Sequence, residues 1–460
     1  MENITVKDIV EVTGGKLLCG DENKIIKEFS IDSREGNEDS IFVPIIGERV
    51  DAHRFIDSAL EKNGASFTSE HEKASGEKPW IRVEDTVEAM QKVGTFYRNR
   101  MEMPVVAVTG SVGKTTTREM ISTALASQKR VFQTKGNQNS QIGVPLTLSH
   151  LSKEDEAAVL EIGMSERGQI EKLTKMIRPN IAVVTMIGVS HIAQLKTQEN
   201  ICQEKMDIVK GLPEDGIVFL NGDDPFLTAY RGRLTHRTFF YGLDAPCDYR
   251  AENIQENAGQ TQFDFIYKEE EKEVHQKIVL GTMGIHNVRN ALAALGVAHQ
   301  MGLDVAKAAL ALQNFHGQRQ QVHFLENVTL IDDTYNASPD SMKAAVAVLA
   351  SMEGVQGRRI AALADMLELG EKEKEYHYEV GTYIAGMNVD EVDAYGELSK
   401  ELMKGIEDHS EKIAVKHFQT REELKEYLLK NVCSGDVLLL KGSNGMKLKE
   451  IADAFFTQSE

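Results

Sequence analysis

The segment at residues 105–117, which reads Val-Val-Ala-Val-Thr-Gly-Ser-Val-Gly-Lys-Thr-Thr-Thr, constrains this chain more than any other. Its four leading apolar residues predict a short buried strand, and the glycines after them predict a tight loop. Lys114 and Thr115 then open a helix that we expect to run through Leu125. Backbone N–H groups and the positive end of a helix dipole would face an anion here, so the segment predicts a phosphate cradle. The alternative is an accidental glycine-rich turn between a strand and a helix.

Two side chains of this cradle carry specific expectations. Lys114 is placed to reach the outer phosphates of a nucleotide, and the Thr115 hydroxyl can hold Mg²⁺. The loop is shorter than the common G-x-x-x-x-G-K-[ST] pattern, because Gly110 lies only three residues before Gly113 and Val108 occupies the usual glycine position. That shortened spacing restricts the set of nucleotide-binding families to which the chain can belong.

Length and composition limit the number of domains, the classes of partner and the compartment expected for this chain. At about 150 residues per domain, 460 residues predict three domains. A net charge of −19 argues against nucleic acid as the main partner and against a polybasic membrane patch. No apolar run approaches the roughly 20 residues of a membrane span. The four cysteines are scattered, and the first residues lack the basic and apolar regions of a signal peptide, so we expect a cytoplasmic protein with reduced thiols.

Short apolar strands alternate with helical segments along the chain, which is typical of an α/β fold. We expect a small N-terminal α/β domain at 1–102, a central parallel-sheet domain with the phosphate loop at 103–314, and a C-terminal Rossmann-like domain at 315–460. The predicted strands are 41–44, 105–108, 158–162, 181–185, 217–220, 328–331, 359–363, 391–395 and 437–440. The predicted helices are 54–63, 87–101, 285–301, 304–313 and 370–387, and 248–280 is predicted to be an antiparallel ribbon.

Polar residues stand where predicted parallel strands end, which is where ligands gather in such sheets. Glu161 ends the strand that follows the phosphate loop, so it is placed to hold Mg²⁺ directly or through water. The alternative is an exposed acid at a strand end. His191 follows the strand at 181–185, and a lone histidine in that position is more often structural than a ligand.

Lys205 lies in a segment, 198–212, that reads as a helix. At helical spacing it shares an apolar stripe with Ile201, Ile208 and Leu212. Such a lysine either extends its charge to the rim or is held in a cleft, where its pKa falls and its amine can be modified. In the third domain polar residues follow three strands, at Asp332–Asn336, at Asp365 and at Lys441–Ser443, which predicts a cleft there.

With these residues in place, the chain resembles the Mur ligases, the ATP-dependent amide-forming enzymes of peptidoglycan assembly. The resemblance spans nearly the whole length. It rests on DSR at 32–34, TGSVGKTTT at 109–117, GNQNSQIGVPLTL at 136–148, EIGMSERGQI at 161–170, HNVRNALAA at 286–294, IDDTYNASPDSMKAA at 331–345, ADMLELG at 364–370 and LKGSNGMKL at 440–448. The last part of the sixth motif, TYNASPDSM, and DMLELG are most similar to the branch that adds a D-alanyl-D-alanine dipeptide.

The resemblance implies a substrate, a chemistry and an assembly. ATP would phosphorylate the carboxylate that ends a UDP-N-acetylmuramoyl-tripeptide, and the amine of D-Ala-D-Ala would then displace phosphate from the acyl phosphate. It also implies Mg²⁺, with two ions in the site, a CO₂-derived carbamate on a lysine, and a monomer. No nucleic acid or membrane takes part. The protein's task in such chemistry is to clamp charge and align the reactants.

The resemblance also implies roles for individual residues. Thr115, Glu161, His191 and Lys205 match the metal site, with Lys205 as the carbamylated lysine and with Lys114, Lys205 and His191 as the catalytic group. The nucleotide would be held by Gly110, Ser111, Val112, Gly113, Lys114, Thr115, Thr116, Asn290, Arg319 and Asp333. The UDP-sugar-peptide and dipeptide would meet Ser33, Arg34, Asn137, Asn139 and Asn336.

Three short stretches depart from the family pattern. Asn137-Gln138-Asn139-Ser140-Gln141 replaces N-x-N-N-E, Thr185-Met186-Ile187 replaces Thr-Asn-Ile, and Asp51-Ala52-His53 replaces Asp-Gly-His. These changes leave the ATPase residues intact. They concern the identity of the acceptor substrate, which the resemblance implies is a UDP-sugar-peptide. The sequence therefore leaves open a divergent paralogue, another Mur or folylpolyglutamate-type ligase, and a non-catalytic nucleotide-binding regulator.

Overall fold

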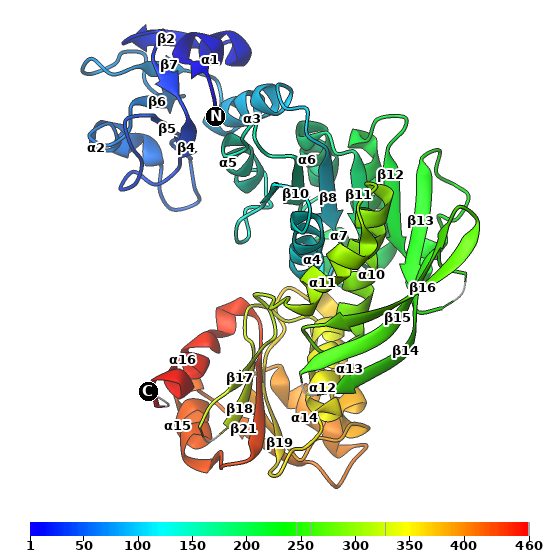
Figure 1. Cartoon of the computed structure of the whole chain (residues 1–460). Coiled ribbons are helices and arrows are strands. Elements are labelled where there is room, and N and C mark those ends of the chain that lie inside the picture. The colour runs from blue at the N-terminus through cyan, green and yellow to red at the C-terminus, as the bar shows by residue number, and fades with distance from the viewer. Residues whose placement is uncertain (245, 258, 327, 459–460) are drawn as a thin grey trace. The chain divides into compact units, whose positions relative to one another are not determined.

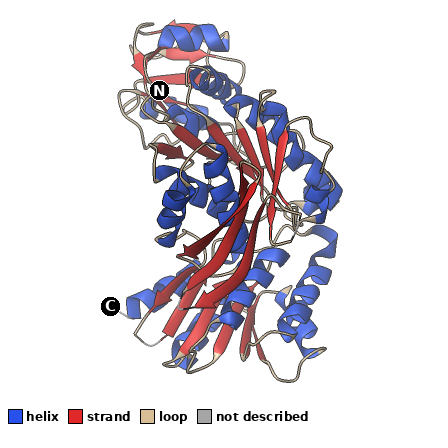
Figure 2. Ribbon diagram, turned by 45° about the vertical axis from the view of Figure 1, so that its right-hand side comes forward, coloured by secondary structure: helices blue, strands red, loops and turns tan. Residues whose placement is uncertain are grey.

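The computed structural model describes residues 1–244, 246–257, 259–326 and 328–458, and its fold is α/β (Figure 1). Helices accompany strands throughout the chain, as Figure 2 shows. Three sheets of five, nine and six strands succeed one another along the sequence, with a two-stranded pair, β1 (Ile4–Thr5) and β3 (Ile25–Ile26), near the start. No helix in the described ranges is long and apolar enough to cross a membrane.

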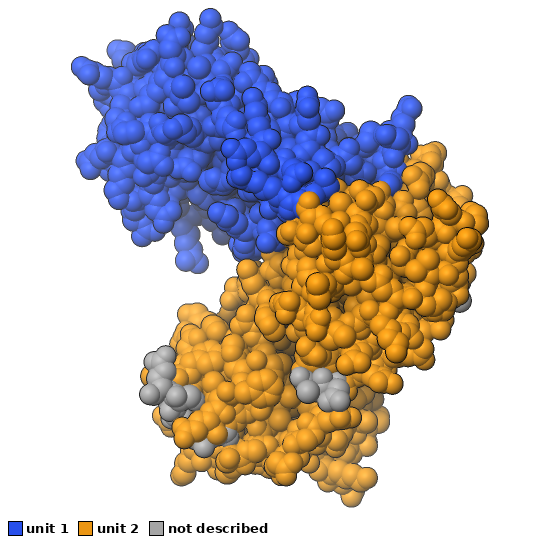
Figure 3. Space-filling model, viewed as in Figure 1, with its two compact units in different colours: residues 1–108, 129–182, 207–217 blue, residues 109–128, 183–206, 218–460 orange. Residues whose placement is uncertain are grey.

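The backbone contacts divide the chain into two compact units (Figure 3). Unit 1 comprises residues 1–108, 129–182 and 207–217, and unit 2 comprises residues 109–128, 183–206 and 218–460. The nine-stranded sheet supplies strands to both units, and the six-stranded sheet lies wholly in unit 2.

The five-stranded sheet has the order β2 (Lys16–Cys19), β7 (Trp80–Arg82), β6 (Ala65–Thr68), β5 (Ser40–Phe42) and β4 (Glu28–Ser30). Along the chain, α1 (Val6–Thr13) precedes the first strand of this sheet and α3 (Thr86–Arg98) follows its last. The helix predicted at 54–63 is shorter, with a 3₁₀ turn at Ala52–Phe55 followed by α2 (Ile56–Ala59). Beyond Ala59 the chain forms turns, in which the Ala59 carbonyl accepts from both the backbone and the side-chain N–H of Asn63.

The nine-stranded sheet contains the predicted strand of the phosphate loop as β8 (Val105–Thr109), followed by α4 (Lys114–Ala126). Its order is β16-β15-β14-β13-β12-β11-β8-β10-β9. The remaining strands are β9 (Val131–Gln133), β10 (Ala157–Glu161), β11 (Ile181–Val184), β12 (Ile217–Asn221), β13 (Arg237–Gly242), β14 (Tyr249–Asn257), β15 (Gln260–Glu269) and β16 (Lys272–Leu280). The last three are antiparallel, which confirms the predicted ribbon.

Helices of this region carry or adjoin the predicted site residues. They are α5 (Gly143–Ser149), α6 (Gln169–Ile177), α7 (Ile192–Leu195), α8 (Gln198–Met206), α9 (Pro225–Thr228), α10 (Ile285–Gln300) and α11 (Val305–Gln313). The helix predicted around Lys205 ends at Met206, and residues 207–211 form a 3₁₀ helix. The apolar stripe expected to reach Leu212 therefore does not continue along one helix.

The six-stranded sheet has the order β17 (Gln321–Phe324), β18 (Val328–Asp333), β22 (Asp436–Lys441), β19 (Arg359–Ala364), β20 (Glu391–Tyr395) and β21 (Ala414–Phe418). Only β17 is antiparallel to its neighbour. Figure 1 shows α12 (Pro339–Ser351), α13 (Glu373–Ala385) and α14 (Ser399–Glu407) on one face, and α15 (Arg421–Asn431) and α16 (Lys449–Gln458) on the other.

This sheet has a separate apolar core on each face. Successive residues of one strand alternate between them, so Leu330 packs with α15 and α16 while Ile331 packs with α12, α13 and α14. A sheet buried on both faces needs nearly continuous apolar strands, which explains Leu438, Leu439 and Leu440 in succession. The C-terminal region is thus a doubly wound sheet, as the sequence predicted.

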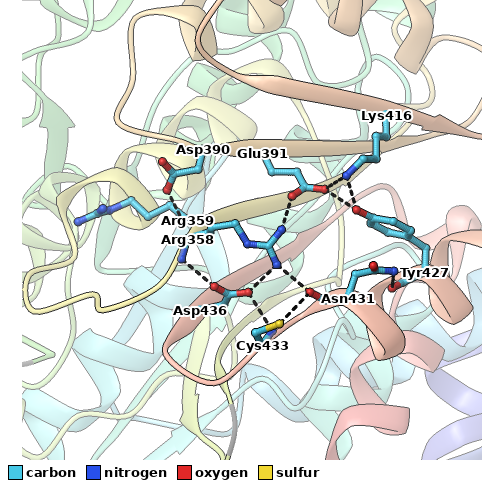
Figure 4. A network of polar contacts seen from close by, with 9 residues as sticks. All are labelled: Arg358, Arg359, Asp390, Glu391, Lys416, Tyr427, Asn431, Cys433 and Asp436. Atoms are coloured by element: carbon cyan, nitrogen blue, oxygen red, sulfur yellow. Dashed lines mark hydrogen bonds and ion pairs between the residues drawn. The ribbon is translucent and has the colours of Figure 1, made fainter.

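A polar network joins the amino ends of β19, β20 and β22 (Figure 4). Arg358 donates to Glu391 Oε2 at 2.6 Å, to Asp436 Oδ2 at 2.8 Å and to the Asn431 carbonyl at 2.7 Å. Burial alone would raise the pKa of Asp436, but the hydrogen bonds from Arg358 outweigh it and hold that pKa below its usual value. The network therefore fastens three strands at the edge opposite to their carboxyl ends.

Asp393, on β20 beside this network, is fully buried, and its carboxyl oxygens have no hydrogen-bond partner among the described residues. Burial, followed by the nearby charge of Glu391, raises its pKa to about 7. The unfolded chain releases this proton near the ordinary pKa of about 4, so the folded state binds the extra proton between about pH 4 and 7. The contribution of Asp393 to stability consequently falls as the pH rises through this window.

We predict that Asp393→Asn stabilises the protein at pH 8 and has little effect at pH 5, because it removes a buried charge present only at the higher pH. The expected gain in free energy of unfolding at pH 8 is about 1–2 kcal/mol, since the unpaired amide offsets part of the electrostatic relief. Urea unfolding at both pH values measures it. Asp390→Asn, at a neighbouring exposed position, is the control and should shift stability equally at both pH values. Parallel pH dependence in the parent and in Asp393→Asn would contradict the prediction.

Candidate active site

The loop between β8 and α4 requires its two glycines. Gly110 has φ 152° and Gly113 has φ 85°, conformations that residues with a Cβ rarely adopt. A Cβ on Gly110 would lie 1.8 Å from Thr185 Oγ1, and one on Gly113 would lie 3.2 Å from Asn290 Oδ1. The shortened spacing seen in the sequence therefore corresponds to a loop that passes close to two neighbouring segments.

Neighbouring residues hold the loop in place. Thr185 donates its hydroxyl to the Val112 carbonyl at 2.6 Å, and the Ser111 amide donates to the Met186 carbonyl at 2.8 Å. Helix α4 begins at Lys114 with Gly113 as its N-cap and no side-chain cap. The first-turn amides of this helix thus face the loop without a capping side chain, which is the arrangement that binds phosphate.

Two lysines converge on one carbonyl of this loop. Lys114 Nζ lies 3.0 Å and Lys205 Nζ lies 2.8 Å from Gly110 O. Lys205 is only 1% exposed, so the interpretation in which its charge reaches the rim is wrong. Burial, followed by the charge of Lys114, lowers the pKa of Lys205 well below its ordinary value. The structure therefore presents a buried amine that favours its neutral, nucleophilic form beside the phosphate loop.

His191 lies between β11 and α7 with φ 65°. Its Nδ1 is buried without a hydrogen-bond partner in the described part of the chain, and lies 3.7 Å from Glu368 Oε2. Burial and then the charges of Lys205 and Lys114 lower the pKa of His191 to about 4. The imidazole is therefore neutral at pH 7, which leaves a nitrogen lone pair for a ligand.

Glu161 ends β10 and is paired in register with Val108, the residue before the phosphate loop begins. Its side chain is 2% exposed and Oε1 accepts a hydrogen bond from Asn139 Nδ2 at 2.7 Å. The alternative of an exposed strand-end acid is therefore wrong. In the described ranges no three His, Cys, Asp or Glu side chains form a metal-binding group. Few protein ligands are typical of Mg²⁺ that also binds substrate phosphates.

The nucleotide residues predicted farther along the chain also adjoin α4. Asn290 is buried on α10 and accepts a hydrogen bond from Thr117 Oγ1 at 2.9 Å. Arg319 Nη2 lies 3.5 Å from Thr115 Oγ1, and its guanidinium carbon lies 3.0 Å from the centre of the Tyr335 ring. Unit 2 therefore brings Asn290 and Arg319 to the first turn of α4, with Tyr335 against Arg319.

Lys441 links two other predicted residues. Its ammonium donates to Asp333 Oδ2 at 2.7 Å and to the Asn336 carbonyl at 2.9 Å, and it is 2% exposed. The adjacent carboxyl ends of β18 and β22 explain this meeting. Asp365, in contrast, accepts hydrogen bonds from Ser399 and supports the start of α14, so it faces inward and does not line the predicted cleft.

In unit 1 the predicted acceptor residues lie in turns. Ser33 and Arg34 form a turn in which Asp32 accepts from the Arg34 backbone and side chain. These bonds from Arg34 lower the pKa of Asp32 despite a small opposing effect of burial. Asn137 is exposed, and its carbonyl accepts from the Asn139 amide at 2.7 Å.

Residues 51–53, where the sequence departs from the family pattern, form a structural hydrogen-bond network. His53 Nδ1 lies 2.7 Å from Asp51 Oδ1, and His53 Nε2 accepts from the Ser69 amide at 3.0 Å and lies 3.1 Å from Ser69 Oγ. The set has the residue types of a hydrolytic triad, but the His53 side chain is 2% exposed while that of Asp51 is 47% exposed. A hydrolase needs the reverse, an accessible base and a buried carboxylate.

Sequence reasoning missed Glu119. It placed Tyr335 and Lys441 at strand ends but did not identify the residues that they contact. Glu119 lies one helical turn beyond Thr115 and accepts from the Gln318 amide. Its spacing from Thr115 was the only signal, and it indicates a shared helix face without naming a partner. The partners of Glu119 and Lys441 lie 199 and 108 residues away in sequence, so pattern alone could not find them.

With this geometry in view, comparisons with known proteins define the class. The family model of the Mur ligase middle domain matches residues 108–298, and that of the Mur ligase, glutamate ligase domain matches residues 318–444. The chain belongs to the Mur ligase family and has its three-domain α/β architecture.

Particular relatives match end to end. The UDP-N-acetylmuramoyl-tripeptide–D-alanyl-D-alanine ligase of Bacillus subtilis (strain 168) is 35% identical over 453 residues, which cover 97% of each chain. A MurF crystal structure from Acinetobacter baumannii is 27% identical, covers 99% of both chains and has a TM-score of 0.89. MurF ligase from Thermotoga maritima in complex with ADP is 28% identical over 93% of this chain and 97% of that chain, with a TM-score of 0.82.

We predict that Gly110→Ala abolishes the loop conformation, because the added Cβ collides with Thr185 and the backbone angle is unfavourable. Affinity for ADP should fall by about 100-fold, as expected when binding groups move by about 1 Å. Isothermal titration calorimetry measures the change. Gly386→Ala is the matched control, since that glycine has φ −91° and its added Cβ would lie no closer than 3.7 Å to any neighbour. Unchanged ADP affinity in Gly110→Ala would refute this account of the loop.

Proposed function

We propose that this chain is an ATP-dependent ligase that joins D-alanyl-D-alanine to UDP-N-acetylmuramoyl-tripeptide for peptidoglycan precursor synthesis. The observation that carries the proposal is the match over 97% of the chain to a ligase named for that reaction. The loop, Lys114 and Lys205 supply the local chemistry that such a reaction needs. The ADP complex of the Thermotoga maritima relative supports ATP as the phosphate donor.

The proposed reaction has two displacements. A carboxylate oxygen of the tripeptide attacks the γ-phosphorus of ATP, ADP leaves, and an acyl phosphate forms. The amine of the dipeptide then attacks the acyl carbon, phosphate departs with its bonding electrons, and the nitrogen loses a proton. A carboxylate is a poor electrophile and phosphate is a good leaving group, so the first step makes the second feasible.

The phosphate loop serves this chemistry by fixing the nucleotide. The first-turn amides of α4 and the Lys114 ammonium are placed to bind phosphate oxygens, and Arg319 adds a guanidinium beside Thr115. We assign nucleotide contacts also to Gly110, Thr116, Asn290 and Asp333. These groups align the donor and neutralise charge that develops on the transferred phosphoryl group.

The residues fit a requirement for Mg²⁺. The hydroxyl of Thr115, the buried carboxylate of Glu161 and the neutral imidazole of His191 are suitable donors, and two ions are proposed. When bound, Mg²⁺ neutralises phosphate charge and polarises the phosphoryl oxygens. Asn139 orients Glu161 through its hydrogen bond, which keeps the carboxylate in one rotamer.

We propose that Lys205 is carbamylated. Its neutral amine would attack the carbon of CO₂ and then lose a proton, which converts a neutral buried group into an anion that can face Mg²⁺. The support is its complete burial and its position beside Gly110, where a second ammonium next to Lys114 is electrostatically unfavourable. The carbamate would remove that conflict.

The acceptor is proposed to contact Ser33, Arg34, Asn137 and Asn139, and the dipeptide to contact Asn336. Asn336 is exposed at the carboxyl edge of the six-stranded sheet, and Lys441 holds its backbone. We further propose a cytoplasmic monomer with domains at 1–102, 103–314 and 315–460. Nucleic acid and membrane have no role in this proposal.

A substrate panel tests the activity. Phosphate release with ATP and Mg²⁺ should require both UDP-N-acetylmuramoyl-tripeptide and D-Ala-D-Ala, and mass spectrometry should detect the pentapeptide product. The panel also contains substrates of related ligases, namely D-Glu, L-Ala, and folate together with glutamate. Release with one of these in place of the proposed pair identifies another ligase, and nucleotide binding without release under every combination identifies a regulator.

We predict that Lys205→Ala abolishes turnover and that a short carboxylate such as acetate or propionate restores part of it, because the small anion occupies the place of the carbamate. Incorporation of ¹³C-labelled CO₂, followed by ¹³C NMR, should give a carbamate signal in the parent that is absent from Lys205→Ala. Lys196→Ala, at a lysine whose ammonium is exposed, is the control and should retain activity. Activity like that of the parent in Lys205→Ala would overturn the carbamate.

A further inference from the structure

Glu119 links the phosphate helix to a segment almost two hundred positions later in the chain. It lies on α4, 7% exposed, and uses both carboxylate oxygens. Oε1 accepts from Arg118 Nη2 at 2.9 Å, and Oε2 accepts from the Gln318 backbone amide at 3.1 Å. A buried charge held on one side by an arginine and on the other by a backbone N–H is fixed in position.

The bond to Gln318 falls in the short segment that joins α11 to β17. Gly317 in the same segment lies against both Glu119 and the ring of Phe315, since a Cβ there would be 3.6 Å from Glu119 Oε2 and 3.1 Å from the ring. The connection therefore rests on α4 at this point. Arg319 is the next residue, so the bond between Glu119 and Gln318 fixes the position of the Arg319 backbone.

Arg319 extends from that anchor back to the start of the same helix. Its guanidinium lies over the Tyr335 ring and 3.5 Å from Thr115 Oγ1. Thr115 and Glu119 are four residues apart, so they share one face of α4. One helix face thus holds both the backbone that precedes Arg319 and the group that its side chain approaches.

We propose that Glu119 is a positioning residue that places the Arg319 guanidinium at the phosphates of the bound nucleotide. An arginine side chain has four rotatable bonds, and a fixed starting point together with the Tyr335 ring reduces the conformations it must give up on binding. The guanidinium then meets phosphate oxygens in a ready orientation. The inference rests on the proposed ATP-dependent function and adds to it how the segment before β17 serves the nucleotide site.

A purely structural role makes a different prediction. If Glu119 only stabilises the fold, its loss lowers stability and acts independently of Arg319. If it works through Arg319, its loss matters only while Arg319 is present, and the two substitutions are not additive. The distinction can be measured in a double-mutant cycle.

The experiment compares Glu119→Ala, Arg319→Ala and the double variant in the full-length protein, with ADP affinity by calorimetry and the KM for ATP as readouts. We expect about a tenfold loss from Glu119→Ala, a larger loss from Arg319→Ala, and no further loss in the double variant. The KM for ATP should rise more than kcat falls. Glu119→Gln should retain affinity near that of the parent, because its amide oxygen still accepts from Gln318.

Asp436→Ala is the matched control for lost stability. It removes a buried carboxylate that binds an arginine and backbone amides, at the amino edge of the six-stranded sheet. It should lower the melting temperature without changing ADP affinity. Multiplicative losses in the cycle, or a loss of affinity from Asp436→Ala equal to that from Glu119→Ala, would overturn the proposal. ADP affinity requires no acceptor, so the cycle remains decisive even if the substrate panel finds no ligase activity.

Discussion

The close approach of the phosphate loop to the segment after β11 is the constraint on which the rest of the site depends. Gly110 passes so near Thr185 that no side chain fits, and the Thr185 hydroxyl and Met186 carbonyl then fix the loop from outside. The same approach leaves the Gly110 carbonyl facing inward, where it accepts from Lys114 and Lys205. A loop held this way is organised before the nucleotide arrives, so binding need not supply the energy to order it.

Electrostatics around that carbonyl define what the site can take. Lys114 and Arg319 bring positive charge to one place in a chain whose net charge is −19. The protein as a whole repels anions, and its local field has to attract a nucleotide. Burial, and after it the positive charge of neighbouring lysines, lowers the pKa values of His191 and Lys205. The neutral forms of both side chains are therefore favoured, and these forms can react or bind a ligand.

The sequence correctly predicted the secondary-structure elements that depend on local residue patterns. Strand, glycine loop and helix at 105–126, the antiparallel ribbon and the alternation of the C-terminal sheet all follow from residue pattern. The helix predicted at 54–63 is instead a 3₁₀ helix followed by a single α-helical turn, and the stripe through Lys205 is interrupted because the helix changes to 3₁₀ geometry. Lys205, Glu119 and Lys441 have partners that lie 95, 199 and 108 residues away along the chain. A sequence pattern carries no signal for contacts at such separations.

The six-stranded sheet has stabilising contacts at the amino ends of its strands and proposed substrate-binding residues at the carboxyl ends. At the amino ends Arg358, Glu391 and Asp436 join three strands, and at the carboxyl ends Asp333 and Lys441 hold residues proposed to meet substrates. Strands of about six residues keep these groups apart. Substitutions at the amino ends of the strands can therefore change the stability of this region while ligand recognition at the carboxyl ends is left unchanged.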